Sequence, residues 1–149
     1  MHAPATTPDT TPAPPGPLQR HMARTYFALR VGIAVIGAAL PVVLWLGGLI
    51  GETEPLLDSM SAYYFSGMRD VFVGALIAIG VFLYLYQGFS TEENVALNVA
   101  GIMAVGVALF PTAATGAPRG TTATLHGAFA IAFFVAIAYV ALTRASDTL

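Results

Sequence analysis

Residues 59–74 have the sequence SMSAYYFSGMRDVFVG and join two long apolar segments of the chain. Arg69 and Asp70 stand immediately before the second of these segments, which begins at Val71. A carboxylate at the N-terminal end of a helix is stabilised by the helix dipole and by backbone N–H groups that have no partner within the helix. The stretch therefore predicts the point at which a polar loop enters an apolar helix.

Four apolar segments follow one another along the chain. They are Val31–Ile50, Val71–Gly88, Val95–Phe110 and Ala123–Leu142. A helix of about 20 apolar residues crosses the roughly 30 Å hydrocarbon core of a bilayer. Pro41 lies inside the first segment, and a membrane helix tolerates proline with a kink. We predict an all-α polytopic membrane protein, a four-transmembrane-helix bundle, with helices at about residues 28–50, 70–88, 94–110 and 122–143.

The composition agrees with a membrane protein. Of 149 residues, 56% are apolar and 9% are charged, whereas a soluble domain carries about 25% charged residues. The net charge of −2 does not favour nucleic acid as a partner. The chain has no cysteine, which excludes disulfides, thiolate nucleophiles and sulfur ligands for a metal.

Residues 1–24 have a different composition, rich in proline, threonine and alanine. Such a segment buries too little apolar surface to offset the entropy lost on ordering. It also lacks the order of basic, apolar and small residues that marks a secretory signal. We predict a disordered cytoplasmic tail at 1–24 and a single membrane domain at 25–145.

The arginines predict the orientation. Four of the six basic residues flank the two ends of the set of helices: Arg20, Arg24, Arg30 and Arg144. Arg69 and Arg119 fall on the opposite side, and basic residues prefer the cytoplasm. Glu92 and Glu93 occupy an inside loop without a basic residue, but acidic residues contribute little to this rule. We predict a plasma (inner) membrane protein with both termini cytoplasmic.

Small residues recur every fourth position in the third and fourth segments. They are Ala96, Ala100, Ala104 and Ala108, followed by Ala128, Ala132 and Ala136. Small residues at this spacing let helix backbones approach closely in a membrane. We expect these two stripes to pack.

The predicted topology gathers polar and aromatic residues at the outer face. The expected binding surface comprises Ser59, Ser61, Tyr63, Tyr64, Arg69, Asp70, Thr112, Arg119 and His126. The aromatic residues among them are also typical of a membrane-interface belt. A lipid or small molecule would bind at this surface.

Asp70 and His126 each admit two interpretations. Asp70 caps its helix, or it faces the other helices as a metal ligand, proton acceptor or substrate anchor. His126 lies within the fourth segment, where an ionisable group is costly and marks a functional site, or it is a hydrogen-bonded residue of the interface. Ser61 is a candidate nucleophile with no base near it in the sequence. One histidine is few for zinc, which takes three protein ligands in catalytic sites.

These residues carry a resemblance to a family of small bacterial integral membrane proteins of unknown activity. It rests on the Ser-x-Ser-x-Tyr-Tyr and Met-Arg-Asp-Val-Phe-Val-Gly patterns within 59–74, on residues 107–112 (VALFPT), and on Leu125-His126. The chain also distantly resembles the alkaline ceramidase and adiponectin-receptor hydrolases, which hold zinc with three histidines in seven helices. Phe65 stands where the Ser-x-x-x-His pattern of those enzymes has histidine, and two other histidines and three helices are missing.

Three hypotheses follow for function. The first is a non-enzymatic protein without a cofactor that binds a lipid or small molecule, or serves as an accessory subunit; its partners are membrane lipids and a second copy or another membrane protein. The alternative is a metal-dependent hydrolase of lipid amides or esters that uses Asp70 and His126, with zinc as the cofactor. The third is a small transporter subunit.

Overall fold

The computed structural model describes residues 16–51 and 57–146, with side chains described up to residue 143. The elements are α1 (Pro17–Gly51), the short 3₁₀ helix η1 (Met60–Phe65), α2 (Arg69–Leu85), α3 (Thr91–Leu109) and α4 (Thr121–Ser146). No strand occurs in these ranges, so the predicted all-α class is confirmed.

Helix α1 begins earlier than predicted. It starts at Pro17 rather than near residue 28, so residues 17–24, expected in the tail, are helical. Proline suits the first position of a helix because its missing N–H would have no partner there. Residues 1–15 lie outside the described part of the chain. With 35 residues, α1 is about 52 Å long at 1.5 Å per residue, well beyond a bilayer core.

Within the described residues, three helices are long and apolar enough to cross a membrane. They are α1, α3 and the Thr121–Thr143 part of α4. Helix α2 is apolar from Val71 onward but has 17 residues, slightly fewer than an ordinary crossing requires.

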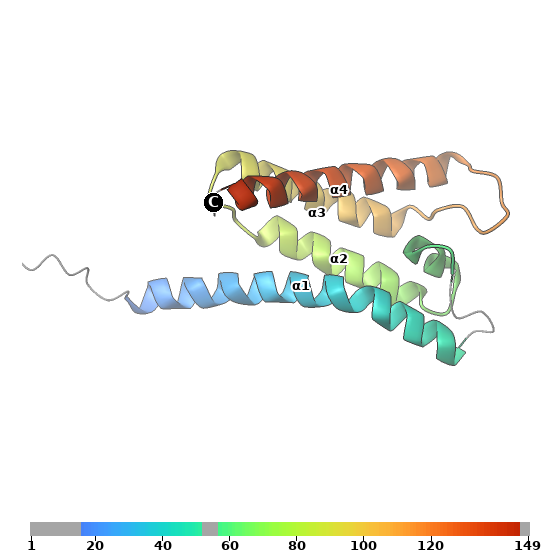
Figure 1. Cartoon of the computed structure of the whole chain (residues 1–149), viewed down its shortest axis with the longest axis horizontal. Coiled ribbons are helices and arrows are strands. Elements are labelled where there is room, and N and C mark those ends of the chain that lie inside the picture. Colours follow the sequence, from blue (N-terminus) through green and yellow to red (C-terminus); the bar gives the residue numbers. More distant parts are fainter. Residues whose placement is uncertain (1–15, 52–56, 147–149) are drawn as a thin grey trace, which may run out of the picture.

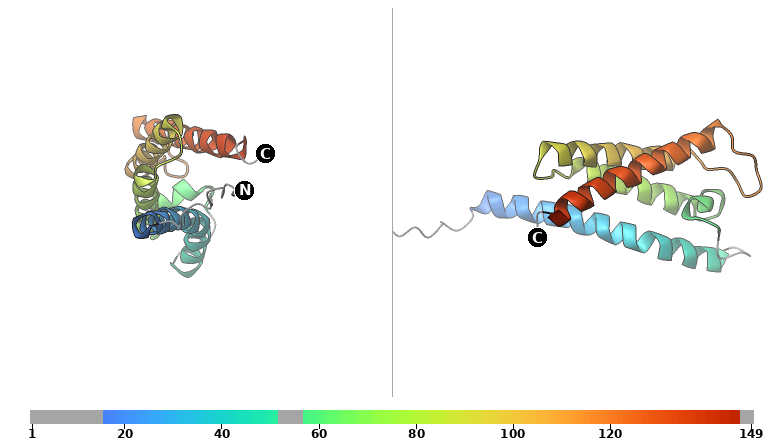
Figure 2. Two further views of the ribbon diagram at one scale, coloured as in Figure 1. Left: turned by 90° about the vertical axis from the view of Figure 1, so that its left-hand side faces the viewer. Right: turned by 45° about the horizontal axis from the view of Figure 1, so that its top comes forward.

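The helices form an open row. Helix α1 packs on α2, α2 on α3, and α3 on α4, while the backbones of α1 and α4 do not come close to each other. Figure 2 shows the result end-on as a curved layer, concave on the side of η1. The predicted bundle is therefore open between its first and last helices in the described residues. The reason lies in α1, which buries only Leu40, Leu44 and Gly48 along one narrow strip.

Helices α2 and α3 meet backbone to backbone at two glycines. A Cβ atom added to Gly101 would lie 2.6 Å from the carbonyl oxygen of Gly80, and one added to Gly80 would lie 2.7 Å from that of Gly101. Real Cβ atoms essentially never approach so closely. The two backbones are thus in direct contact, and each glycine makes room for the other helix.

The predicted alanine stripes have different outcomes. Ala100, Ala104 and Ala108 of α3 are at most 1% exposed, so the stripe on α3 packs as expected. On α4, Ala136 is buried but Ala128 is exposed. The stripe on α4 is therefore only partly used.

The turn between α2 and α3 is tied by side chains at the start of α3. Ser90 accepts a hydrogen bond from the Glu93 N–H at 3.2 Å, and the Glu93 carboxylate accepts one from the Phe89 N–H at 2.8 Å. Asn94 accepts a further bond from the Gly88 N–H. This reciprocal arrangement is a form of capping box. It explains how Glu93 is held at 5% exposure.

One end of the molecule carries η1, the start of α2, the end of α3 and the start of α4 (Figure 1). We call it the η1 end. Its core cluster includes Leu44 of α1, Tyr63 of η1, Phe72 of α2 and Ala108 of α3. The short helix η1 thereby packs onto the long helices and closes this end of the row.

Candidate functional site

Helix η1 is held by hydrogen bonds at both of its ends. The Ser59 hydroxyl accepts from the Ala62 N–H at 3.3 Å, as an N-cap residue does. The Ser66 hydroxyl donates to the Tyr63 carbonyl at 2.9 Å. With both ends fixed, η1 buries the Tyr63 side chain to 6% exposure and turns Ser61 toward the long helices.

Ser61 meets His126 of α4 and the end of α3 in a chain of two hydrogen bonds. The His126 Nε2 atom lies 3.0 Å from the Ser61 hydroxyl oxygen. The His126 Nδ1 atom lies 2.6 Å from the Phe110 carbonyl oxygen. Three elements far apart in the sequence therefore meet at one imidazole ring.

The partners determine which tautomer a neutral His126 ring adopts. The Phe110 carbonyl can only accept, so Nδ1 carries the hydrogen and donates it. In the neutral ring Nε2 is then unprotonated, and the Ser61 hydroxyl donates to it. His126 is only 6% exposed, and each of its nitrogens has a partner, as a buried polar group requires.

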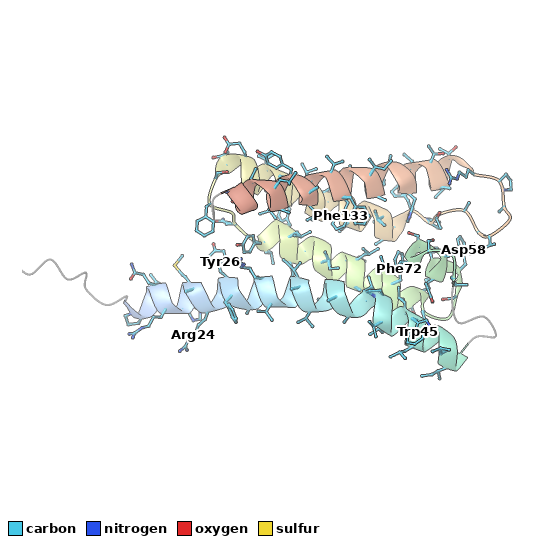
Figure 3. All side chains as sticks on the ribbon, viewed as in Figure 1. Arg24, Tyr26, Trp45, Asp58, Phe72 and Phe133 are labelled. Carbon is cyan, nitrogen blue, oxygen red and sulfur yellow. The ribbon has the colours of Figure 1, made fainter. Side chains whose placement is uncertain are left out.

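A cavity of about 80 Å³ adjoins Ser61 on the inner side of η1. Its lining includes one residue from each element: Leu40, Ser61, Phe72, Val107 and Phe133. Apart from the Ser61 hydroxyl, these side chains are apolar. Figure 3 shows Phe72 and Phe133 between the helices of the row. We call this space the η1 cavity.

Arg69 pairs with an aromatic residue at the surface of the same end. Its guanidinium donates to the Tyr64 hydroxyl at 2.8 Å and lies 4.4 Å from the centre of the Tyr64 ring. This combines a hydrogen bond with a cation–π contact. Arg69 remains exposed, so its charge is presented at the η1 end.

The other predicted binding residues do not join this group. Asp70 is exposed in the first turn of α2 and has no hydrogen-bond or ion-pair partner in the described part of the chain. Its position agrees with stabilisation by the helix dipole. Arg119 is exposed and Thr112 is half-buried, while Ser59 serves η1 as its cap.

The residues do not fit a zinc site. Within residues 16–51 and 57–146, no three or more histidine, aspartate or glutamate side chains are grouped so that they could hold a metal ion. Both nitrogens of His126 are engaged in hydrogen bonds. Catalytic zinc needs three protein ligands, and the structure does not assemble them around His126.

Sequence reasoning missed two contributions. The Phe110 carbonyl, which orients His126, belongs to the backbone and leaves no side-chain signal. The capping role of Glu93 did have a signal, since Ser90-Thr91-Glu92-Glu93 matches the Ser-x-x-Glu capping pattern.

The opposite end of the molecule holds a larger and more polar cavity. It measures about 460 Å³ and is lined in part by Tyr26, Arg30, Tyr86 and Gln87. Tyr26 lies on the side of α1 that faces α2, and Arg24 lies on the opposite side (Figure 3). Edge-to-face packing of Tyr26 on Tyr86 forms one wall.

Comparison of the chain with protein-family models, with curated proteins and with solved structures finds no match.

Proposed function

We propose that the chain is a four-span plasma-membrane protein that binds the acyl chain of a lipid or similar amphiphile in the η1 cavity. In this proposal both termini are cytoplasmic, and the η1 end faces outward. The apolar span of α1, α3 and α4 supports membrane insertion. Helix α2, about 26 Å long at 1.5 Å per residue, crosses as the partner of α3.

One observation carries the binding proposal. The η1 cavity is a partly open apolar space lined by residues of η1 and of all four helices, and the backbones of α1 and α4 do not approach each other beside it. Apolar walls favour a hydrocarbon ligand and exclude a charged one. The open side gives such a ligand a lateral route from the bilayer.

The surface of the η1 end suits the polar part of the ligand. Arg69 presents an exposed guanidinium held against Tyr64, and arginine recognises phosphate and carboxylate groups through paired hydrogen bonds. An anionic headgroup fits the exposed Arg69 surface, and an acyl chain fits the apolar η1 cavity below it. The exposed apolar faces of α1 and α4 contact other membrane lipids.

The topology is tested with single cysteines, since the natural chain has none. Phe65→Cys and Thr91→Cys lie at opposite ends of α2, and both positions are exposed. We expect a membrane-impermeant maleimide to label Phe65→Cys in spheroplasts and Thr91→Cys only after lysis. Labelling of both variants from the same side would contradict the crossing by α2.

Filling the η1 cavity is expected to remove the bound lipid. Ala130 lines the cavity, so Ala130→Leu places additional carbon atoms in it. Ala128 is exposed on the same helix, and Ala128→Leu is the matched control. Native mass spectrometry of protein extracted in mild detergent should find lipid on the natural chain and on Ala128→Leu, and at least tenfold less on Ala130→Leu. Equal lipid on both variants would refute binding in the cavity.

A further inference from the structure

We propose that Ser61 is a nucleophile activated by His126, and that it cleaves the carboxylic ester of a lipid whose acyl chain occupies the η1 cavity. The inference rests on the proposed function for the position of the acyl chain. It departs from the metal-dependent alternative, because the donor set does not fit zinc and the serine has a base of its own.

The hydrogen bonds at His126 have the donor and acceptor roles that a serine nucleophile needs. The Phe110 carbonyl holds the hydrogen on Nδ1, at a distance of 2.6 Å. This leaves the Nε2 lone pair facing the Ser61 hydroxyl at 3.0 Å. A base within about 2.6–3.2 Å of the hydroxyl, and itself oriented by a third group, is the arrangement that activates serine. Here the third group is a backbone carbonyl instead of a carboxylate.

The surroundings of the pair agree with this chemistry. His126 is 6% exposed, so water competes little for its nitrogen. The imidazolium formed during reaction keeps its Nδ1–H bond to the Phe110 carbonyl. The negative end of that carbonyl dipole stabilises the new positive charge. Ser61 is half-buried and is the polar member of the η1 cavity lining described above.

The cavity and the dyad together indicate the substrate class. The cavity of about 80 Å³ has room for the first few CH₂ groups of an acyl chain, whose carbonyl carbon then lies beside Ser61, while the rest of the chain extends out of the cavity on its open side. An ester suits a dyad without a carboxylate, because an alcohol leaves more readily than an amine. The opening between α1 and α4 admits such a molecule from the bilayer.

The reaction balances with water as the second substrate. The Ser61 oxygen forms a bond to the ester carbonyl carbon while its proton passes to His126 Nε2. The bond from that carbon to the alcohol oxygen breaks, and the alcohol leaves with the proton from His126. Water then attacks the carbonyl carbon of the acyl-serine and gives a proton to His126. The bond from that carbon to the Ser61 oxygen breaks, and His126 returns the proton to this oxygen. A carboxylic acid is released and no electrons are exchanged.

The test uses a long-chain alkyl fluorophosphonate on the full-length protein in lipid nanodiscs. We expect the probe to attach to Ser61, with the site located by peptide mass spectrometry. Ser61→Ala should abolish labelling, and Thr115→Ala should label at the natural rate because the Thr115 hydroxyl is exposed in the loop between α3 and α4 and has no histidine partner. General-base catalysis contributes about 10²–10⁴-fold, so His126→Gln should slow labelling by at least 100-fold.

The outcomes separate the nucleophile from the lipid site. An unlabelled Ser61 in protein that still carries lipid would refute the nucleophile and leave the binding proposal standing. Labelled Ser61 in protein without bound lipid would support the nucleophile and refute acyl-chain binding. Ser61→Ala should keep its thermal unfolding temperature within a few degrees, and equal labelling of Ser61→Ala and the natural chain would overturn the inference. If His126→Gln does not fold, Ser61→Ala and Thr115→Ala decide.

Discussion

Replacing Gly101 with leucine is expected to destabilise the protein by about 3 kcal/mol, the upper part of the range for overpacking a well-packed interior. The added Cβ atom would lie 2.6 Å from the Gly80 carbonyl oxygen. Backbone atoms cannot rotate aside as a side chain can, so α2 and α3 must separate. Their separation weakens the packing of α2 against α3.

Thermal unfolding in nanodiscs measures this effect. For a chain of this size, about 3 kcal/mol corresponds to a fall of roughly 10 °C in Tm. Gly74→Leu is the matched control, because a Cβ atom at Gly74 would meet nothing within 4 Å. A Tm of Gly101→Leu equal to that of Gly74→Leu would show that the backbones are not in contact.

Replacing His126 with leucine is expected to cost a similar amount, again about 3 kcal/mol. The change leaves the Phe110 carbonyl and the Ser61 hydroxyl without their partner, and a polar group that loses its partner costs about 1–3 kcal/mol. Ser61→Ala removes one of the two bonds and should cost about 1 kcal/mol. We therefore predict that His126→Leu destabilises the protein more than Ser61→Ala does.

The same unfolding measurement tests His126, with His21→Leu as the control. The His21 side chain is exposed on α1, so its loss should leave Tm within about 1 °C. Comparable stability of His126→Leu and His21→Leu would contradict the buried hydrogen-bond chain. A drop in Ser61→Ala as large as that in His126→Leu would show that η1 depends on the serine alone.

Most of the fold could be predicted from the sequence, because apolar runs and the polar residues that interrupt them are local features. The predicted start of α1 was wrong because residues 17–24 carry arginine and glutamine. These residues are compatible with a helix as well as with a solvated tail. The backbone contact between α2 and α3 was missed for a different reason. Gly80 and Gly101 mark it, and neither belongs to a repeated small-residue stripe.

Only part of the candidate site could be predicted from the sequence. Topology places Ser61 and His126 at one end, but they are 65 residues apart, and only the packing of η1 brings them to hydrogen-bond distance. Asp70 stood out because a carboxylate before an apolar run is conspicuous. Its exposure could not be read from that pattern, since the side of a helix end that faces the neighbours depends on how the helices pack.

The capped turn between α2 and α3 has a consequence for how the chain is made. Helix α2 has only 17 residues. By itself it has a weak tendency to pass from the translocation machinery into the bilayer. Ser90 and Glu93 fix the turn locally, and the contact of Gly80 with Gly101 pairs the two backbones. We expect α2 to wait for α3 during synthesis, so that the two enter the bilayer together as a preassembled hairpin.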